Sequence, residues 1–213
     1  MGFSTLLDIL GSSLVGGMLL LIMFRLNDAS IENSFMYTGN LLVQQNLVSI
    51  VDVINHDFNK IGYCEKWENI PDPAYSILSA TDTSISFLTD LPSLSHPYGD
   101  GIIDTLKYYS GSVSELTETP NPRDRILYRV VGNSTPDGSN LGVTYFKLTY
   151  FDSAGNILPS PVVTSKIRSI QIDLKLEDIY GYDAGNLDKS DSERYANAVW
   201  KQLKISSPNL RNR

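Results

Sequence analysis

The sequence has few of the residues that catalytic and metal centres usually require. Its 213 residues include one cysteine, Cys64, and two histidines, His56 and His96. A single cysteine excludes an internal disulfide framework and a thiolate metal cluster, and two histidines leave little material for imidazole catalysis. No nucleophile elbow, phosphate-binding loop, dinucleotide fingerprint or His-Glu-x-x-His motif occurs. The sequence therefore predicts a protein that is not an enzyme and has no organic cofactor.

Positive charge is scarce as well. The 17 Lys and Arg residues are outnumbered by 24 Asp and Glu residues, which gives a net charge of −7, and no basic stripe occurs. Since contacts with phosphate need clustered cations, nucleic acid is not expected among the partners. Hydrophobic residues make up 42% of the chain and charged residues 19%, a composition that favours a folded core over wholesale disorder.

Proline is absent between Met1 and Pro71, and most of this stretch has the pattern of a helix. From Phe3 to Phe24 the only charge is Asp8. About twenty apolar residues, at 1.5 Å each, cross the roughly 30 Å hydrocarbon core of a bilayer. A secretory signal peptide is the alternative, but it would have a cationic start and a small-x-small cleavage site before Arg25, and neither occurs. We expect a retained membrane helix.

The same helix is predicted to continue with an amphipathic half. Its apolar residues recur at intervals of three and four, which places them on one face; they are Leu47, Val48, Val51, Ile54, Phe58 and Ile61. Gly62 then lies where a helix would stop, and Pro71 forbids its continuation. The expected helix runs from about residue 4 to residue 61.

Beyond Pro71 the apolar period changes from 3.6 to 2, which indicates strands. The alternating segments are SISFLTD, IIDTLKYYS, RILYRVV (125–131), VTYFKLTYF (143–151, resuming at Ile157), KIRSIQIDLKLED (166–178) and residues 198–205. The sequence thus predicts an α+β fold in which a long N-terminal hydrophobic and amphipathic helix packs on an antiparallel β-sheet. The expected segments are a membrane-spanning half-helix (1–26), an amphipathic half-helix (27–62) and the sheet domain (63–213).

Four stretches, in this order, resemble the type IV pilin superfamily, and in particular its J-like minor pseudopilins and W-like minor pilins. GFSTLLDIL (2–10) is similar to a class III prepilin signal, and HDFNKIGY (56–63) to the helix end of W-like pilins. The three strands from residue 125 to residue 176, with a Tyr-x-Asp-x-x-Gly turn between the second and the third, follow the order in J-like pseudopilins. SPNLRNR at the C-terminus resembles the ending common in that group.

This resemblance implies a structural subunit that assembles through its N-terminal helix into a type IV pilus-like or type II secretion filament, as a minor or priming subunit. The implied partners are other pilin-like subunits, an inner-membrane assembly platform and membrane lipid. The implied location is the bacterial inner membrane, with a single pass and the C-terminal domain in the periplasm or outside the cell, or a surface filament. Residues 1–26 would then form the filament core.

The resemblance also implies roles for individual residues. Cleavage after Gly2 would make Phe3 the new, methylated terminus, and Asp8 would pair with the α-amino group of a neighbouring subunit. Asp8 would then be the sixth residue, whereas the family has an acid at the fifth. As an alternative, the Asp8 side chain reaches the membrane interface. Arg25 would face lipid phosphates or an acidic neighbour, or it would be an ordinary anchor at the end of the membrane span.

A late acidic segment is a candidate calcium site. Asp183, Asp188 and Asp191 offer hard oxygen ligands near glycine and asparagine. Some major pseudopilins bind Ca²⁺ in a late loop, but the spacing here does not match an EF-hand, so a solvated acidic turn is the alternative.

Two other functions compete with filament assembly. The first is a single-pass, membrane-anchored β-rich accessory subunit of a larger membrane complex, which forms no filament. It is favoured by the N-terminus, because only Met1 precedes Gly2 where family leaders carry basic residues. The second is an enzyme, which would require a pocket that gathers His56 or His96 with several carboxylates.

Overall fold

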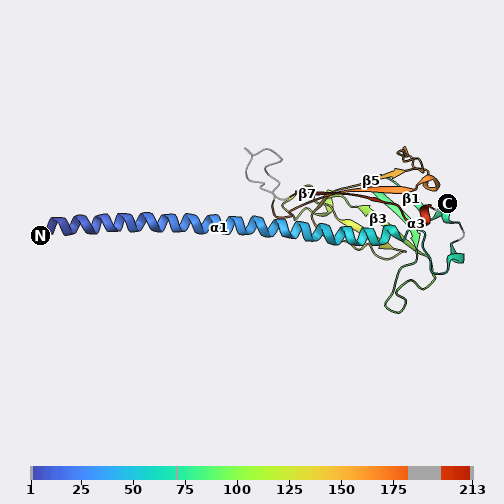
Figure 1. Ribbon diagram of the computed structural model, residues 1–213, viewed down its shortest axis with the longest axis horizontal. Coiled ribbons are helices and arrows are strands. Elements are labelled where there is room, and N and C mark those ends of the chain that lie inside the picture. Colours follow the sequence, from blue (N-terminus) through green and yellow to red (C-terminus); the bar gives the residue numbers. More distant parts are fainter. Residues whose placement is uncertain (1, 71, 182–197, 212–213) are drawn as a thin grey trace. The chain divides into compact units, whose positions relative to one another are not determined.

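The computed structural model describes residues 2–70, 72–181 and 198–211 (Figure 1). A single long helix, α1 (Gly2–Asn59), begins the chain, so the predicted helix is confirmed. Contacts divide the chain into two compact units, residues 1–39 and residues 40–213, and α1 contributes to both. The Gly16–Gly17 pair does not interrupt the helix, because no proline accompanies it to remove a backbone hydrogen bond.

In the second unit, α1 presents one buried face. Val43, Leu47, Ile50, Ile54 and Phe58 are buried, with spacings of three and four residues. The prediction that placed Val48 on this face was wrong, because its side chain is 57% exposed. At 100° per residue, position 48 lies about 120° around the helix from position 54, outside the buried stripe.

The C-terminal end of α1 is capped by the other end of the chain. Ser207 donates its hydroxyl to the carbonyls of Asn59 (2.9 Å) and Ile61 (3.0 Å). These carbonyls have no partner within the helix, so the serine satisfies groups that burial would otherwise penalise. Gly62 follows with a φ of 70°, as expected of a helix-ending glycine, and its N–H bonds to the Leu88 carbonyl at 2.8 Å.

Among the described residues, seven strands follow the helix, all paired antiparallel. They are β1 (Ile77–Ala80), β2 (Ser84–Thr89), β3 (Asp104–Ser110), β4 (Leu127–Val131), β5 (Val143–Phe151), β6 (Ser169–Glu177) and β7 (Ala198–Ile205). Short helical turns connect them: η1 (Trp67–Asn69), η2 (Pro73–Tyr75), η3 (Val113–Glu115) and η4 (Thr164–Lys166); α3 (Pro208–Arg211) follows β7. The α+β class is therefore confirmed.

The strands form two sheets, β1-β2-β3-β4 and β5-β6-β7, where the sequence pattern predicted one. Alternation shows which residues face a core but does not show which strands pair, so it cannot count sheets. Two details also differ from the prediction. Strand β1 was not predicted, and the expected resumption at Ile157 is one isolated bridge to Phe151.

Both sheets contribute to the core that covers the buried face of α1. The inward side of β6, made of Ile170, Ile172, Leu174 and Leu176, belongs to the same buried cluster as Phe58. Phe58 is fully buried, and its ring lies 5.4 Å from Phe87 of β2 and 5.5 Å from Tyr108 of β3, centroid to centroid. This aromatic ring therefore joins α1 to the first sheet.

Replacing Phe58 with alanine should lower the free energy of unfolding of residues 40–213 by about 3–5 kcal/mol, because a fully buried ring leaves a cavity. Denaturant unfolding of the full chain in detergent, followed by tryptophan fluorescence, would measure the loss. Val48→Ala is the matched control on the exposed side of the same helix and should change little. Equal stability of the two variants would contradict this account of the core.

Candidate functional site

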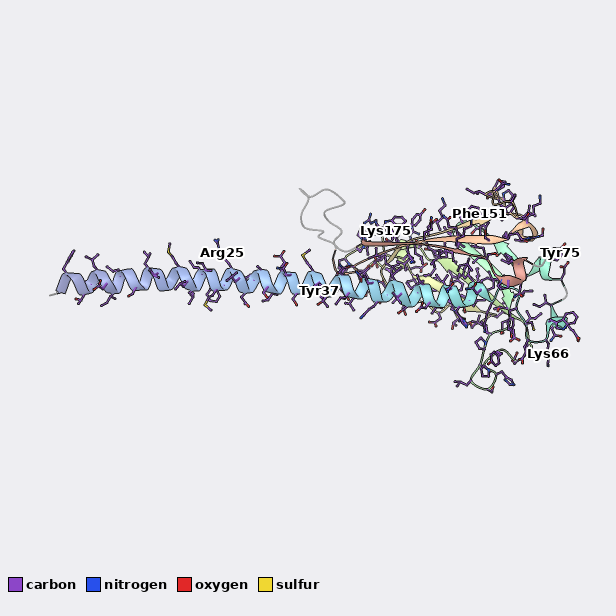
Figure 2. The ribbon with its side chains drawn as sticks, viewed as in Figure 1. Arg25, Tyr37, Lys66, Tyr75, Phe151 and Lys175 are labelled. Atoms are coloured by element: carbon purple, nitrogen blue, oxygen red, sulfur yellow. The ribbon has the colours of Figure 1, made fainter. Side chains whose placement is uncertain are left out.

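The first unit consists of helix alone, and its apolar side chains are exposed on all sides. Phe3 is 80% exposed, and Leu14, Phe24 and Phe35 are exposed as well. Figure 2 shows side chains, Arg25 among them, extending in several directions around this part of α1. In the described part of the chain, α1 is the one helix long and apolar enough to cross a membrane. A segment with this surface can lie in lipid or pack against other apolar helices.

Three hydroxyl groups near the start of this segment are satisfied by the helix itself. Thr5 donates to the Gly2 carbonyl at 3.1 Å, Ser12 to the Ile9 carbonyl at 3.0 Å, and Ser13 to the Leu10 carbonyl at 3.0 Å. Such bonds to the preceding turn let a hydroxyl enter an apolar medium without an unpaired donor. They lower the cost of removing the segment from water.

Asp8 and Arg25 are charged side chains that the helix does not satisfy. In the described residues, neither Asp8 nor Arg25 makes a hydrogen bond or ion pair. Seventeen residues separate them, which is about 25 Å along a helix, so they cannot pair within one chain. Gly2 and Phe3 lie in the first turn of α1. The structure thus does not bring together the predicted processing and assembly residues, which remain spread along one helix.

A buried carboxylate, Asp57, connects the end of α1 to the first sheet. Its Oδ2 accepts a hydrogen bond from the Tyr108 hydroxyl at 2.5 Å and one from Arg129 Nε at 2.7 Å. His56 Nδ1 lies 3.2 Å from Oδ1. An acid in the last turn is unfavourable with the helix dipole, so the sheet residues supply the compensation that the helix lacks.

The pKa values of this cluster keep it an ion pair with a neutral tyrosine. Burial, followed by the charge of Asp57, raises the pKa of Tyr108 well above its usual range. For Arg129, burial alone would lower the pKa, but the hydrogen bond and the charge of Asp57 outweigh it and raise the value. At neutral pH, Tyr108 is therefore a donor and Arg129 a cation.

A shallow groove beside this cluster gathers the helix residues Asp52, His56 and Asp57. Val53, Leu91, Pro92 and Arg129 complete its lining. His56 therefore lies near carboxylates, as an enzyme site would need, but no serine, threonine, cysteine or lysine lines this groove as a nucleophile. His96 is elsewhere, bonded to Ser95 at 3.1 Å. The Asp57–Arg129 ion pair forms part of the lining of this groove.

A second buried carboxylate, Glu177, ends strand β6. It contacts Lys175 Nζ at 2.5 Å and Arg123 Nη2 at 2.7 Å, and accepts a bond from Asn121 Nδ2 at 3.0 Å. Burial would raise its pKa, but the bonds from Lys175 and Asn121 and the charge of Arg123 outweigh it, so the pKa is lowered. Glu177 is thus held ionised.

The pKa of Asp124, close to Glu177, is shifted in the opposite direction. It is 1% exposed, and its Oδ2 accepts a 3.4 Å bond from Asn140. Burial raises its pKa to about 6, and the charges of Glu177 and Asp178 add to this effect. Asp124 therefore takes up a proton at mildly acidic pH.

Three of the predicted residues lie outside the described part of the chain. They are the calcium candidates Asp183, Asp188 and Asp191, for which the calcium site stays a prediction. Within residues 2–70, 72–181 and 198–211, no three His, Cys, Asp or Glu side chains are placed to hold a metal ion together.

Sequence reasoning missed the Asp57–Arg129 pair, although two signals pointed to it. Asp57 precedes Phe58 on the buried stripe, and Arg129 lies on the same side of its strand as Leu127 and Val131, which pack against the core. An inward arginine needs a buried anion. Because 72 positions separate the two residues, the pattern could suggest each need but not the pairing.

Arg129→Ala should destabilise the fold by about 2–4 kcal/mol, because it leaves the Asp57 carboxylate buried without its cation. Thermal and denaturant unfolding would measure the loss. The double variant Asp57→Leu with Arg129→Met removes both charges and should be more stable than the single variant. If the single variant unfolded like the unaltered chain, the pair would have no stabilising part.

Asp124→Asn should stabilise the chain at pH 7 by at most about 3 kcal/mol, since a pKa raised from 3.8 to about 6 destabilises the ionised folded state. The destabilisation by ionised Asp124 is complete above pH 6 and decreases as the pH falls toward 3.8. The free energies of unfolding of the unaltered chain and the variant should therefore converge on acidification. Unfolding midpoints at pH 7, 6 and 5 would measure this. A difference that is constant with pH would contradict the assignment.

Comparison with known proteins gives one structural likeness. No protein-family model matches the chain, and no curated protein matches it by sequence. Among solved structures, the chain is similar to a type IV-like pilin from Thermus thermophilus, with 11% sequence identity and a TM-score of 0.45. The alignment covers 78% of this chain and 97% of that one.

Proposed function

We propose that this chain is a pilin-like structural subunit that assembles through the first part of α1 into a type IV pilus-like or type II secretion filament, as a minor or priming subunit. One observation carries the proposal: residues 2–39 form a helix with exposed apolar side chains on all sides. Its partners would be other pilin-like subunits and an inner-membrane assembly platform.

The free energy of this apolar surface supports assembly in two stages. Exposed to water, each large apolar side chain forgoes roughly 1.5–3 kcal/mol of burial free energy. Lipid can cover the helix first, which gives a single-pass protein of the bacterial inner membrane with its β-rich unit in the periplasm or outside the cell. Other apolar helices can then replace lipid.

Asp8 supports a protein partner over lipid alone. A carboxylate near the hydrocarbon core costs several kcal/mol unless a cation neutralises it. A neighbouring subunit could supply that cation as the α-amino group of Phe3, after cleavage behind Gly2. Insertion of each subunit would then neutralise the Asp8 carboxylate of an adjacent subunit. Arg25, at the other end of the apolar stretch, would lie near lipid phosphates or an acidic neighbour.

The second candidate is a single-pass, membrane-anchored accessory subunit that forms no filament. The same exposed helix favours it, because lipid alone could cover every apolar residue between Phe3 and Phe24. In that case Asp8 would reach the membrane interface instead of a neighbouring amine.

Replacing Asp8 with alanine should leave the protein in the membrane but lower its incorporation into assemblies by roughly tenfold or more, since a lost charge pair is worth over 1 kcal/mol at low dielectric. Crosslinking in membranes, with the crosslinked fraction quantified, would measure this. Asp28→Ala is the matched control, because Asp28 is an acid of the same helix beyond the apolar stretch. Normal incorporation of the Asp8 variant would remove this residue from the mechanism.

The mature N-terminus distinguishes the two candidates. Cleavage after Gly2 should give an intact mass that begins at a methylated Phe3, because an amine at that residue is the cation the assembly model requires. Intact-mass spectrometry of protein from membranes measures this directly. A terminus that retains Met1 would favour the accessory subunit.

A further inference from the structure

We propose that one face of the second sheet binds a loop cluster of a second copy of this chain. The lysine–aromatic face consists of Tyr145, Lys147, Lys175, Trp200 and Lys204. The acidic loop cluster consists of residues 65–70, 72 and 98–102. The proposal rests on the proposed function, because it describes how β-rich units of successive subunits would contact one another.

Strand register places the residues of the lysine–aromatic face in rows. Tyr145 of β5 pairs with Lys175 of β6, which pairs with Trp200 of β7. The Tyr145 and Trp200 rings lie 5.2 Å apart, and Lys175 Nζ lies 5.7 Å from the Trp200 ring centre. Trp200 remains 59% exposed. Exposed Tyr and Trp side chains are enriched at protein interfaces.

Two more lysines extend this face. Lys147 pairs with Asp173 in the next row and is exposed, and Lys204 pairs with Gln171 and lies 3.9 Å from the Phe151 ring centre. Asp173 accepts bonds from Gln171 and Gln202, so its oxygens are already engaged. Lys175 is paired with Glu177 at 2.5 Å, so Lys147 and Lys204 against Asp173 give this face a net charge of +1, on a chain whose net charge is −7.

The acidic loop cluster is held together by Asp90, which is fully buried. Its carboxylate accepts bonds from the backbone N–H groups of Glu65 (3.0 Å), Asp100 (3.1 Å) and Gly101 (2.9 Å). Asn69 adds a bond to the Gly101 carbonyl at 2.5 Å. Two loops distant in sequence are thus fixed to each other, and a fixed surface loses little entropy on binding.

The cluster exposes large apolar side chains within a rim of carboxylates. Trp67 is 76% exposed, Tyr98 73% and Ile102 66%. The exposed acids are Glu65, Glu68, Asp72 and Asp100, against one exposed cation, Lys66. The cluster has a local charge of −3, opposite in sign to that of the lysine–aromatic face. Both surfaces carry exposed aromatic side chains.

The two surfaces cannot satisfy each other within one chain. Figure 2 places Lys66, of the loop cluster, and Lys175, of the sheet face, well apart on the β-rich unit. A contact between different patches of identical chains is heterologous, and it repeats without closing unless the rotation forms a ring. Open repetition is the geometry that a filament needs. Because the two surfaces have opposite charges, a second copy of this chain is the partner that the lysine–aromatic face would bind.

Charge exchange tests the proposal. A face variant carries Lys147→Glu and Lys204→Glu, and a loop variant carries Glu65→Lys and Glu68→Lys. Sedimentation velocity of the full chain in detergent, which covers the apolar helix, would measure self-association at low and high salt. Each variant alone should associate at least roughly tenfold more weakly than the unaltered chain, because like charges would face each other. An equimolar mixture should recover association, since each variant complements the other.

A control variant carries Lys60→Glu and Lys107→Glu, which remove the same charge from outside the face; it should associate normally. Unchanged association of both test variants would overturn the proposal, and so would a mixture that fails to recover, which would indicate a different partner. If β-rich units do not associate in detergent while Asp8-dependent crosslinks form in membranes, this inference fails and the proposed function stands. If neither occurs, both fail.

Discussion

The apolar surface of residues 2–39 is the constraint on which the rest of the molecule depends. Within the described chain, nothing covers side chains such as Phe3 and Phe24. Water is a poor solvent for them, so this helix needs lipid or other helices, whichever lies nearer. The hydroxyls of Ser12 and Ser13 are already bonded to the helix backbone, whereas Asp8, in the proposed assembly, would need a cation from a neighbouring subunit.

The β-rich unit meets a different requirement, which is to hold the last turns of α1 firmly. Phe58 does so through aromatic contacts, and Asp57 through an ion pair with Arg129. The two residues are adjacent in sequence, yet one depends on exclusion of water and the other on charge. Together they attach a single turn of helix to β2, β3 and β4.

Local patterns predicted the elements well. The absence of proline predicted α1, and alternation predicted β5 with the bounds that the structure has. Pairing between distant segments could not be predicted, so the division into two sheets and the Asp57–Arg129 pair were missed. The four-residue strand β1 is too short for its period to be distinguished from chance. Sequence could single out Asp8 because a lone charge in an apolar run is visible without a fold, and its part in assembly stays a prediction.

The bonds from Ser207 to the end of α1 join residues 148 positions apart. During synthesis, the helix leaves the ribosome long before the serine that completes its terminus. The carbonyls of Asn59 and Ile61 therefore lack their final donor until translation is almost over. A chain cut short by a few residues would keep its apolar helix and every strand, yet its core would remain open at one corner, where a quality-control protease could begin.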